Sequence, residues 1–243
     1  MRIPRSIQLH AESGTVHFFW RCHNKEKHLK PESIKDLYAK CMRNSYFELN
    51  RDEKRVIVHA FCVMPNHYHS MPSYFKGSES LSQLAHKAHS SFATKFNKLN
   101  HRTGSVAEGR PKTPLIENYT HMMRVHFYIE ANPIRSKLCS LEQLREYKHC
   151  SYRYYAHGET DETTSILTPP QWYIDLGKTP KERQKIYRKL FANYIHKNLG
   201  AVLHFFSNYI GDSNWIKLNK KRIYDTLQKL TSKHLESKSV NTS

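Results

Sequence analysis

The tripeptide His67-Tyr68-His69 offers the clearest chemistry in this chain. It follows Val56–Met64, an almost continuously apolar run that is typical of a buried strand. Because alternate residues of a strand point to the same face, both imidazoles can reach one metal ion. Two neutral nitrogens hold a divalent ion weakly, so a third ligand and a reacting group must come from elsewhere in the chain.

Tyr128 and Asn132, one helical turn apart, meet that need. A helical wheel places both of them with His121, on the side opposite the main apolar stripe. A tyrosine in a chain with 15 tyrosines is more often a packing or surface residue, and this alternative stays open. With the histidine pair, however, the two residues indicate a metal-dependent enzyme with a tyrosine nucleophile.

The His-x-His pattern is not specific by itself. It also occurs in cupin barrels, amidohydrolase barrels and metallo-β-lactamase-like hydrolases, and two strand histidines can be merely structural. Each of these hydrolase classes lacks a feature here, because no Asp-His follows His69 and the order of elements is neither an eight-stranded barrel nor a jelly roll. The spacing therefore favours another kind of site.

The composition favours a polyanionic partner. Lys and Arg number 39 against 21 Asp and Glu, which gives a formal net charge of +18 in 243 residues. Basic residues exceed acidic ones on both sides of residue 150, so no detachable basic tail explains the charge. Nucleic acid fits this balance better than a neutral metabolite does, although a basic solvated surface is the alternative.

The five cysteines include no CxxC pair and are odd in number, which argues against a disulfide framework or a zinc ribbon. A reducing cytoplasm is the expected location. The N-terminus has no apolar signal-peptide core, and no stretch approaches the ~18 apolar residues of a membrane span. We expect no membrane association.

Periodicity and turn signals predict the order of elements up to residue 132. Pro65 and Asn66 suit the middle of a tight turn, so the strand after Val56–Met64 should fold back antiparallel. Ser80 and Gln83 form a capping-box pattern, Asn118 can cap a helix, and Pro133 ends that helix near residue 132. The predicted elements are a strand at 15–22, a helix at 31–47, a central strand at 56–64, a strand at 67–74, a helix at 80–99, an extended piece at 113–117 and a helix at 118–132.

This β-α-β-β-α-β order predicts an α+β fold of the ferredoxin-like kind. Helices cover one side of its antiparallel sheet, and the added helix at 118–132 could cover the other. Pro72 cannot donate to a sheet ladder, so we expect the strand at 67–74 to be short or to lie at an edge.

Beyond residue 150 the sequence becomes rich in Tyr and irregular. Thr168-Pro169-Pro170 predicts a break. Thr179, Pro180 and Glu182 then combine a cap, an N1 proline and an acidic N3 residue, which predicts a helix to about Lys197. A second basic helix is expected at 214–233. We therefore divide the chain into residues 1–152, which carry the site, and a basic, mainly helical extension at 153–243.

Two motifs closely resemble the REP-associated tyrosine transposases, a branch of the HUH single-tyrosine transposases. The motifs are His67-Tyr68-His69 after Met64-Pro65-Asn66, and Tyr128-Ile129-x-x-Asn132-Pro133-Ile134-Arg135. The resemblance runs from the strand at 15–22 to Tyr152 and becomes faint beyond it. It includes Asn97-Lys98-Leu99-Asn100 with Gly104, and Ser151-Tyr152.

The resemblance implies roles for the site residues. His67 and His69 would hold Mg²⁺ or Mn²⁺, with Asn132 as the third ligand through its amide oxygen. Tyr128 would attack a phosphodiester of single-stranded DNA, which leaves a 5′-phosphotyrosine bond and a free 3′-hydroxyl. The expected partner is single-stranded DNA with a palindromic hairpin, and residues 1–152 would form an HUH tyrosine transposase or nuclease domain.

DNA contacts outside this centre are less specific. Arg110 and Lys112 are candidate phosphate contacts, with a solvated loop as the alternative, and Ala107 to Arg110 departs from the usual family pattern there. Tyr74 and Trp172 could stack on unpaired bases, or they could be core residues.

Two rival functions remain open. One is a transposase-derived protein that binds hairpin DNA without cutting it, and the other is a zinc hydrolase that uses water and does not need Tyr128. Monomer and homodimer are both compatible with the sequence.

Overall fold

The computed structural model describes residues 4–9, 11–199 and 208–240, and side chains as far as residue 232. The strands are β1 (Gly14–Val16), β2 (Phe18–Arg21), β3 (Val56–Met64), β4 (His67–Tyr74), β5 (Leu115–Ile116) and β6 (Tyr209–Ile210). The helices are α1 (Arg5–Gln8), α2 (Glu32–Leu49), α3 (Glu79–Leu99), α4 (Tyr119–Glu130), α5 (Asn132–Arg135), α6 (Tyr152–His157), α7 (Gln171–Ile174), α8 (Pro180–Asn198) and α9 (Ser213–Val240), with 3₁₀ turns at His23–Lys25, Glu142–Glu146 and Thr164–Ile166.

A mixed α+β fold with a mostly antiparallel sheet is confirmed. The sheet has 6 strands. Across it, β3 pairs with β4, β4 pairs with both β1 and β2, β1 pairs with β5, and β5 pairs with β6. The last pair is parallel and the others are antiparallel. The strand predicted at 15–22 is interrupted at His17, and both of its halves, β1 and β2, pair with β4. The first strand and β4 therefore lie inside the sheet.

The prediction that Val56–Met64 is a central strand was wrong. β3 pairs with β4 on one side, and on the other side it meets short irregular segments. The amide groups of Val63, Ser151 and Thr168 donate there to His149, Phe61 and Val58 over 2.9, 3.0 and 2.8 Å. The apolar run reflects two covered faces, and it carries no information about which edge of the strand is paired.

The prediction that Pro72 makes β4 short or places it at an edge was also wrong. β4 lies between β3 and the first strand along its whole length. Pro72 stands opposite Val58, where the register shifts around His59, and on its other side it lies beside the interruption at His17. Pro72 has no backbone N–H, and at this position neither β3 nor the first strand needs one as a hydrogen-bond donor.

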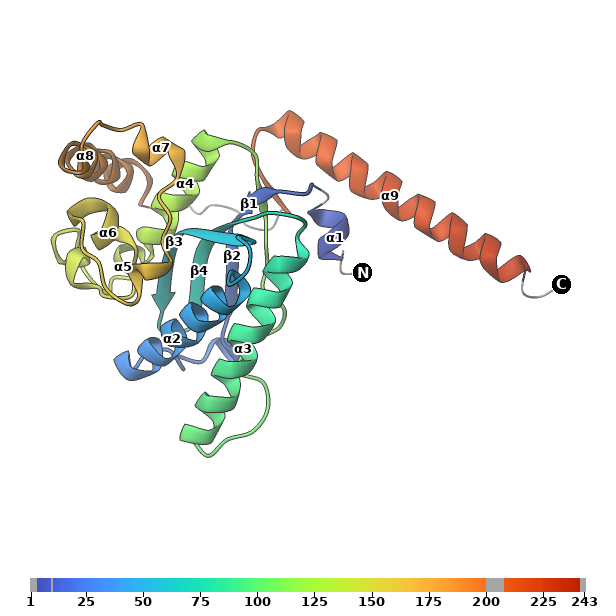
Figure 1. Ribbon diagram of the computed structural model, residues 1–243, viewed down its shortest axis with the longest axis horizontal. Coiled ribbons are helices and arrows are strands. Elements are labelled where there is room, and N and C mark those ends of the chain that lie inside the picture. Colours follow the sequence, from blue (N-terminus) through green and yellow to red (C-terminus); the bar gives the residue numbers. More distant parts are fainter. Residues whose placement is uncertain (1–3, 10, 200–207, 241–243) are drawn as a thin grey trace.

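Helices α2 and α3 cover one face of the sheet (Figure 1). The helix predicted at 31–47 is confirmed as α2, with Pro31 at its N-cap. The helix predicted at 80–99 is confirmed as α3, but its predicted capping box was wrong. Ser78 occupies the N-cap, and the Ser80 hydroxyl donates to the Gly77 carbonyl over 3.0 Å.

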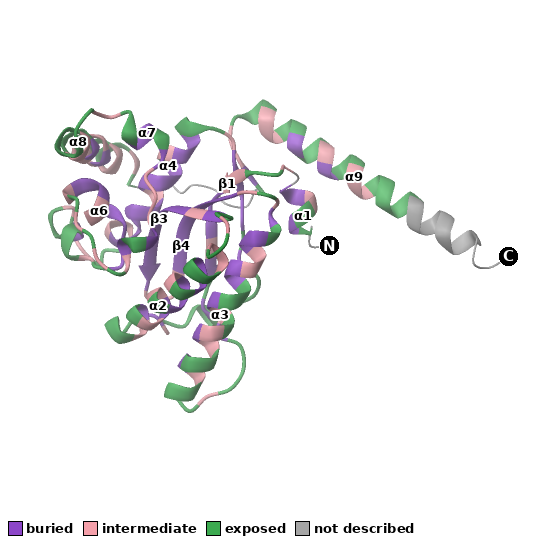
Figure 2. Cartoon of the chain, in the orientation of Figure 1, coloured by how far each residue is buried: buried purple, intermediate pink, exposed green. Residues whose placement is uncertain are grey.

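Helix α4 covers the other face, together with residues that follow in the sequence. Figure 2 shows the strands and the inward sides of these helices as buried. A cluster of aromatic side chains joins α4, through Phe127, to Tyr155, Trp172, Tyr187 and Phe191. This cluster extends across residue 152, and the division of the chain there stays a prediction.

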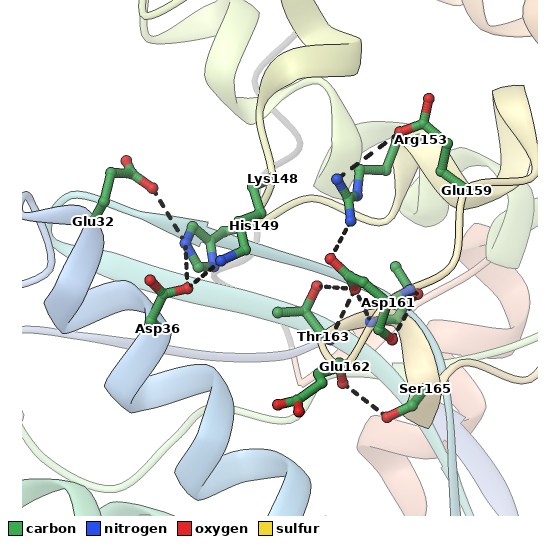
Figure 3. Close-up of polar contacts among 11 residues, drawn as sticks. Glu32, Asp36, Lys148, His149, Arg153, Glu159, Asp161, Glu162, Thr163 and Ser165 are labelled. Carbon is green, nitrogen blue, oxygen red and sulfur yellow. Dashed lines mark hydrogen bonds and ion pairs between the residues drawn. The ribbon is translucent and has the colours of Figure 1, made fainter.

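A network of polar contacts fixes the segment after Tyr147 against α2 (Figure 3). His149 Nε2 lies 3.2 Å from Glu32 Oε2 and 3.5 Å from Asp36 Oδ1, while Arg153 forms an ion pair with Asp161. The segment that covers the outer edge of β3 is therefore tied to α2 through His149 and held internally by Arg153.

The two basic helices differ in their surroundings. The capping box predicted for α8 is confirmed: Thr179 Oγ1 accepts from the Glu182 N–H over 3.2 Å, and Glu182 Oε2 accepts from the Thr179 N–H over 3.1 Å. Helix α8 packs on the body, whereas α9 extends away from it (Figure 1). None of the helices in the described part of the chain has the length and apolar character needed to cross a membrane.

Candidate metal and tyrosine site

His67 and His69 lie at the closed end of the β3–β4 hairpin, as predicted. Their ring centroids are 4.8 Å apart, and in the sheet they stand opposite Arg21 and Phe19 of β2. Met71, the next residue on that face, belongs to the cluster under α4, so both imidazoles face α4.

Each imidazole has its Nδ1 atom fixed by a neighbouring side chain. His67 Nδ1 lies 2.6 Å from Asn66 Oδ1, and His69 Nδ1 lies 2.8 Å from His17 Nε2. These contacts orient both rings and leave Nε2 of each as the atom suited to hold a metal ion.

Burial keeps these imidazoles neutral. It lowers the pKa of His67 to about 4, with the charge of Arg21 acting in the same direction and a hydrogen bond with Asn132 opposing it. Burial and the neighbouring His67 likewise lower the pKa of His69 well below its usual value. Neutral imidazole is the form that binds metals.

Asn132, the predicted third ligand, lies beside His67. Its Nδ2 donates to the carbonyls of Tyr128 and Ile129 over 2.9 and 3.1 Å, which fixes the amide orientation. The Oδ1 atom is then the one that faces His67, and it can accept a hydrogen bond from the protonated form of that ring. Two neighbouring imidazoles and one amide oxygen beside them are therefore available as donors, and this donor set would fit Mn²⁺ well and Mg²⁺ with added water or phosphate oxygens.

Tyr128 stands beside the histidines. Its ring centroid is 5.9 Å from those of His17 and His69, both in edge-on geometry. The side chain is half-buried, whereas its neighbours Phe127 and Ile129 are buried. The structure thus brings together the tyrosine, the paired histidines and Asn132.

Arg135 lies against the Tyr128 ring, with its guanidinium carbon 4.4 Å from the ring centroid. Burial raises the pKa of the Tyr128 phenol, and the charge and hydrogen bond of Arg135 oppose that shift. Arg135 also donates to the carbonyls of Asn198 and Leu199 at the end of α8, over 3.1 and 3.3 Å. It therefore connects the tyrosine to a segment that the motifs did not include.

Lys112 approaches the same site from the β2 side. Its backbone forms two hydrogen bonds with Phe19, of 2.9 and 3.0 Å, and its ammonium lies 5.6 Å from the Phe19 ring centroid. The Phe19 ring is in turn 5.6 Å from that of His69. Arg110 lies on the same exposed loop. Both predicted phosphate contacts are thus exposed, and Lys112 borders the site.

A buried carboxylate holds the end of α4 that carries Tyr128. Glu130 is fully buried and accepts hydrogen bonds from Ser151 Oγ at 2.5 Å and from the Tyr187 hydroxyl. His126 Nε2 lies 3.2 Å from the same carboxylate. This network joins α4 to α8 and to the segment along β3, so the position of Tyr128 depends on all three.

The opposite end of α4 carries a second group with metal-binding side chains. Glu117, His121 and Asp212 place one ligand atom each within 4.8 Å of the others. His121 Nδ1 is 3.0 Å from Asn118 Oδ1, the helix cap, and Glu117 Oε2 accepts from the Asp212 N–H over 2.6 Å. At ~1.5 Å of rise per residue, Tyr119 lies ~14 Å along α4 from Tyr128.

Neither aromatic residue proposed for base stacking is available for it. Tyr74 is 0% exposed and Trp172 is 8% exposed, and both belong to the core. Tyr74 and Trp172 are therefore core residues and not base-stacking residues, since a ring that stacks on a base must have an exposed face.

Three residues of the site were missed or left unassigned by the motif analysis: His17, Arg21 and Arg135. Two of them had a usable signal, because His17, Phe19 and Arg21 alternate along the first strand and so share one face. The contact between Arg135 and the end of α8 has no such local signal.

No protein-family model matches the chain, and no curated protein matches it either. A solved structure described as a REP-associated tyrosine transposase bound to a REP hairpin is similar to it. The TM-score is 0.43 at 17% sequence identity, over 63% of this chain and 86% of that one. It is the kind of protein that the two motifs resemble.

Proposed function

We propose that this protein is a metal-dependent tyrosine transposase or nuclease of the HUH kind. It nicks and rejoins single-stranded DNA beside hairpin-forming palindromic repeats, through a 5′-phosphotyrosine intermediate. The observation that carries the proposal is the convergence of Tyr128 with His67, His69 and Asn132, because these are the residue types that such a reaction requires.

Each side chain has a distinct role in the proposed reaction. His67, His69 and Asn132 would hold Mg²⁺ or Mn²⁺, and an ion bound there would polarise the scissile phosphate. The Tyr128 oxygen forms a bond to phosphorus while the bond from phosphorus to the 3′ oxygen breaks, and the phenolic proton ends on the 3′-hydroxyl. The bond energy is kept in the phosphotyrosine, so the strand can be rejoined without a nucleotide triphosphate.

The cations around the site suit a polyanionic substrate. Arg21 and Lys112 are exposed beside the paired histidines, and Arg135 lies over the Tyr128 ring at 4.4 Å. Arg135 can offset negative charge that develops on the phenolic oxygen, since guanidinium stays protonated at any physiological pH. Arg110 is a further candidate phosphate contact on the same loop as Lys112.

The strand order is consistent with the ferredoxin-like sheet that we propose for this domain, with the first strand and β4 inside and β3 and β5 flanking them. We place the protein in the cytoplasm beside the chromosome, where its substrate would be found. Both a monomer and a homodimer are compatible with this proposal.

Replacing the nucleophile tests the proposal. Purified protein is incubated with labelled hairpin DNA carrying a single-stranded flank, in Mn²⁺ or Mg²⁺, and a denaturant-resistant protein–DNA adduct is sought. Tyr128→Phe removes only the attacking oxygen, so it should lose the adduct entirely. Tyr194→Phe is the matched control, because the Tyr194 hydroxyl also contacts Arg135, at 3.4 Å, and this variant should keep the adduct.

Each alternative result supports a different function. Tight binding of hairpins by the wild-type protein with no adduct on any of them would favour the non-cleaving DNA-binding protein. Cutting that survives Tyr128→Phe would favour a hydrolase that activates water.

A further inference from the structure

Helix α9 presents a row of cationic side chains along one face. Lys217, Lys220, Lys221 and Tyr224 recur at helical spacing, and all four are exposed, Tyr224 to 61%. At ~1.5 Å per residue, this lysine face extends for about 10 Å along the helix.

The opposite side of α9 fixes its base to the body. Ile223 is 5% exposed and belongs to the core cluster that also contains the α2 and α3 side chains. Arg222 donates to the Tyr209 hydroxyl over 3.1 Å and to the carbonyl of Gln8 over 3.4 Å. The lysine face therefore has a fixed direction at the point where the helix leaves the body (Figure 2).

The lysine face has no acidic partner among the side chains that the structure describes. Among the described side chains, no ion pair includes Lys217, Lys220 or Lys221, and Asp225, one turn beyond Lys221, is exposed and forms no ion pair either. Lys217 and Lys221 are one turn apart, where like charges repel and weaken a helix. Helix α8 buries two aromatic rings, those of Tyr187 and Phe191, whereas α9 buries Asn219 and Ile223 near its start and is exposed from Gln228 to Ser232.

We propose that this lysine face binds the phosphates of duplex DNA, namely the stem of the hairpin whose unpaired flank reaches Tyr128. The inference rests on the proposed function. A polyanion would offset the repulsion between the lysines and stabilise the exposed side of α9. Duplex fits better than single strand, because single-strand binding needs several aromatic platforms and Tyr224 is the one aromatic side chain on this face.

Helix α9, the arm, is connected to the candidate site through α4. The Glu117 N–H donates to the Ile210 carbonyl over 2.9 Å, just before α9 begins. Tyr128 lies on the same helix, ~14 Å further along. A stem of ten base pairs is about 34 Å long, so one hairpin can extend from the site to the arm.

Removing the three charges tests the proposal. The variant Lys217→Gln, Lys220→Gln, Lys221→Gln keeps helix-forming residues at each position. The control variant Lys30→Gln, Lys40→Gln, Lys98→Gln removes the same charge from exposed lysines on or beside α2 and α3, away from the site. Binding is measured from 50 mM to 500 mM salt on a hairpin with a ten-base-pair stem and on an unpaired strand of equal length, with thermal melts to show that each variant is folded.

The expected result is a loss specific to duplex. Without three phosphate contacts, the slope of log affinity against log salt should fall by about 2.7 for the hairpin, and binding near 0.15 M salt should weaken roughly 10- to 100-fold. The control variant should change both values much less. For the unpaired strand, both variants should behave alike.

Two outcomes would overturn the inference: an equal loss in the control variant, or a loss that is as large on the unpaired strand as on the hairpin. A failure of the proposed function looks different. In that case the wild-type protein forms no adduct with the hairpin, and this result does not depend on how tightly the Lys217→Gln, Lys220→Gln, Lys221→Gln variant binds DNA.

Discussion

The two ends of α4 both place histidine next to other metal-binding side chains, yet they are built differently. At the end near Asn132, the ring of His69 is buried and its Nδ1 is fixed by His17 at 2.8 Å. At the start of the helix, His121 faces Glu117 and Asp212, and the side chain of Asp212 is 76% exposed.

Their electrostatic settings differ too. The N-terminus of a helix carries partial positive charge, which favours the carboxylates there and opposes a cation. The Glu117 carboxylate also accepts the Asp212 N–H over 2.6 Å, a contact that ties α9 to α4. Residue types alone therefore do not identify a catalytic metal site. Fixed donor atoms and a nearby reacting group distinguish the end that carries Tyr128.

The largest expected difference between the two ends is in catalysis. His69→Ala removes a proposed ligand and should lower DNA cleavage by at least about 1000-fold, since metal catalysis supplies several kcal/mol. His121→Ala should leave the cleavage rate within about twofold. Rates of adduct formation at saturating Mn²⁺ measure both effects. Equal losses in the two variants would mean that the group at the start of α4 contributes to the reaction.

The next effect concerns stability. Glu130→Ala leaves the Tyr187 hydroxyl, Ser151 and His126 without their buried acceptor, and we expect a loss of about 3–5 kcal/mol in the free energy of unfolding. Asp212→Ala, at the other end, should cost less than about 1 kcal/mol because its carboxylate is exposed.

Urea unfolding measures both values, and Glu130→Gln serves as the control because it keeps an acceptor oxygen. If Glu130→Ala were no more destabilising than Asp212→Ala, the network would not be what holds the tyrosine end of α4.

The smallest of the three effects concerns the contact behind His69. His17→Ala removes the partner of His69 Nδ1 and should weaken Mn²⁺ binding about 10- to 100-fold, as is usual for residues that orient a metal ligand. His17→Gln can restore a hydrogen bond and should recover part of the affinity. Calorimetric titration with Mn²⁺ measures this without DNA, and unchanged affinity in His17→Ala would remove His17 from the site.

The sequence predicted much of the fold because its signals are local. The hairpin turn at Pro65 and Asn66, the cap at Asn118 and the capping box of α8 involve residues three or four apart, and each is found in the structure. The predicted capping box at Ser80 failed because the chain already turns at Gly77, so the helix begins earlier.

Tertiary structure decided what lies next to what across the sheet. The apolar run of β3 gave no sign that this strand lies beside irregular segments, and Pro72 gave no sign that a bulge and a strand interruption would accommodate it. Both outcomes depend on hydrogen bonds between residues far apart in sequence, which no local pattern encodes.

For the candidate site too, the sequence determined some features and the tertiary structure decided others. The alternation of His67 with His69 and the helical spacing of Tyr128 and Asn132 are properties of single elements, so the sequence alone determined which residues could act together. Only the packing of α4 against β4 placed the tyrosine ring 5.9 Å from that of His69, and only the approach of α8 connected Arg135 to Asn198 and Leu199. The physical reason is that the periodicity of one element fixes the direction of its side chains, whereas the distance between elements follows from how the whole core packs.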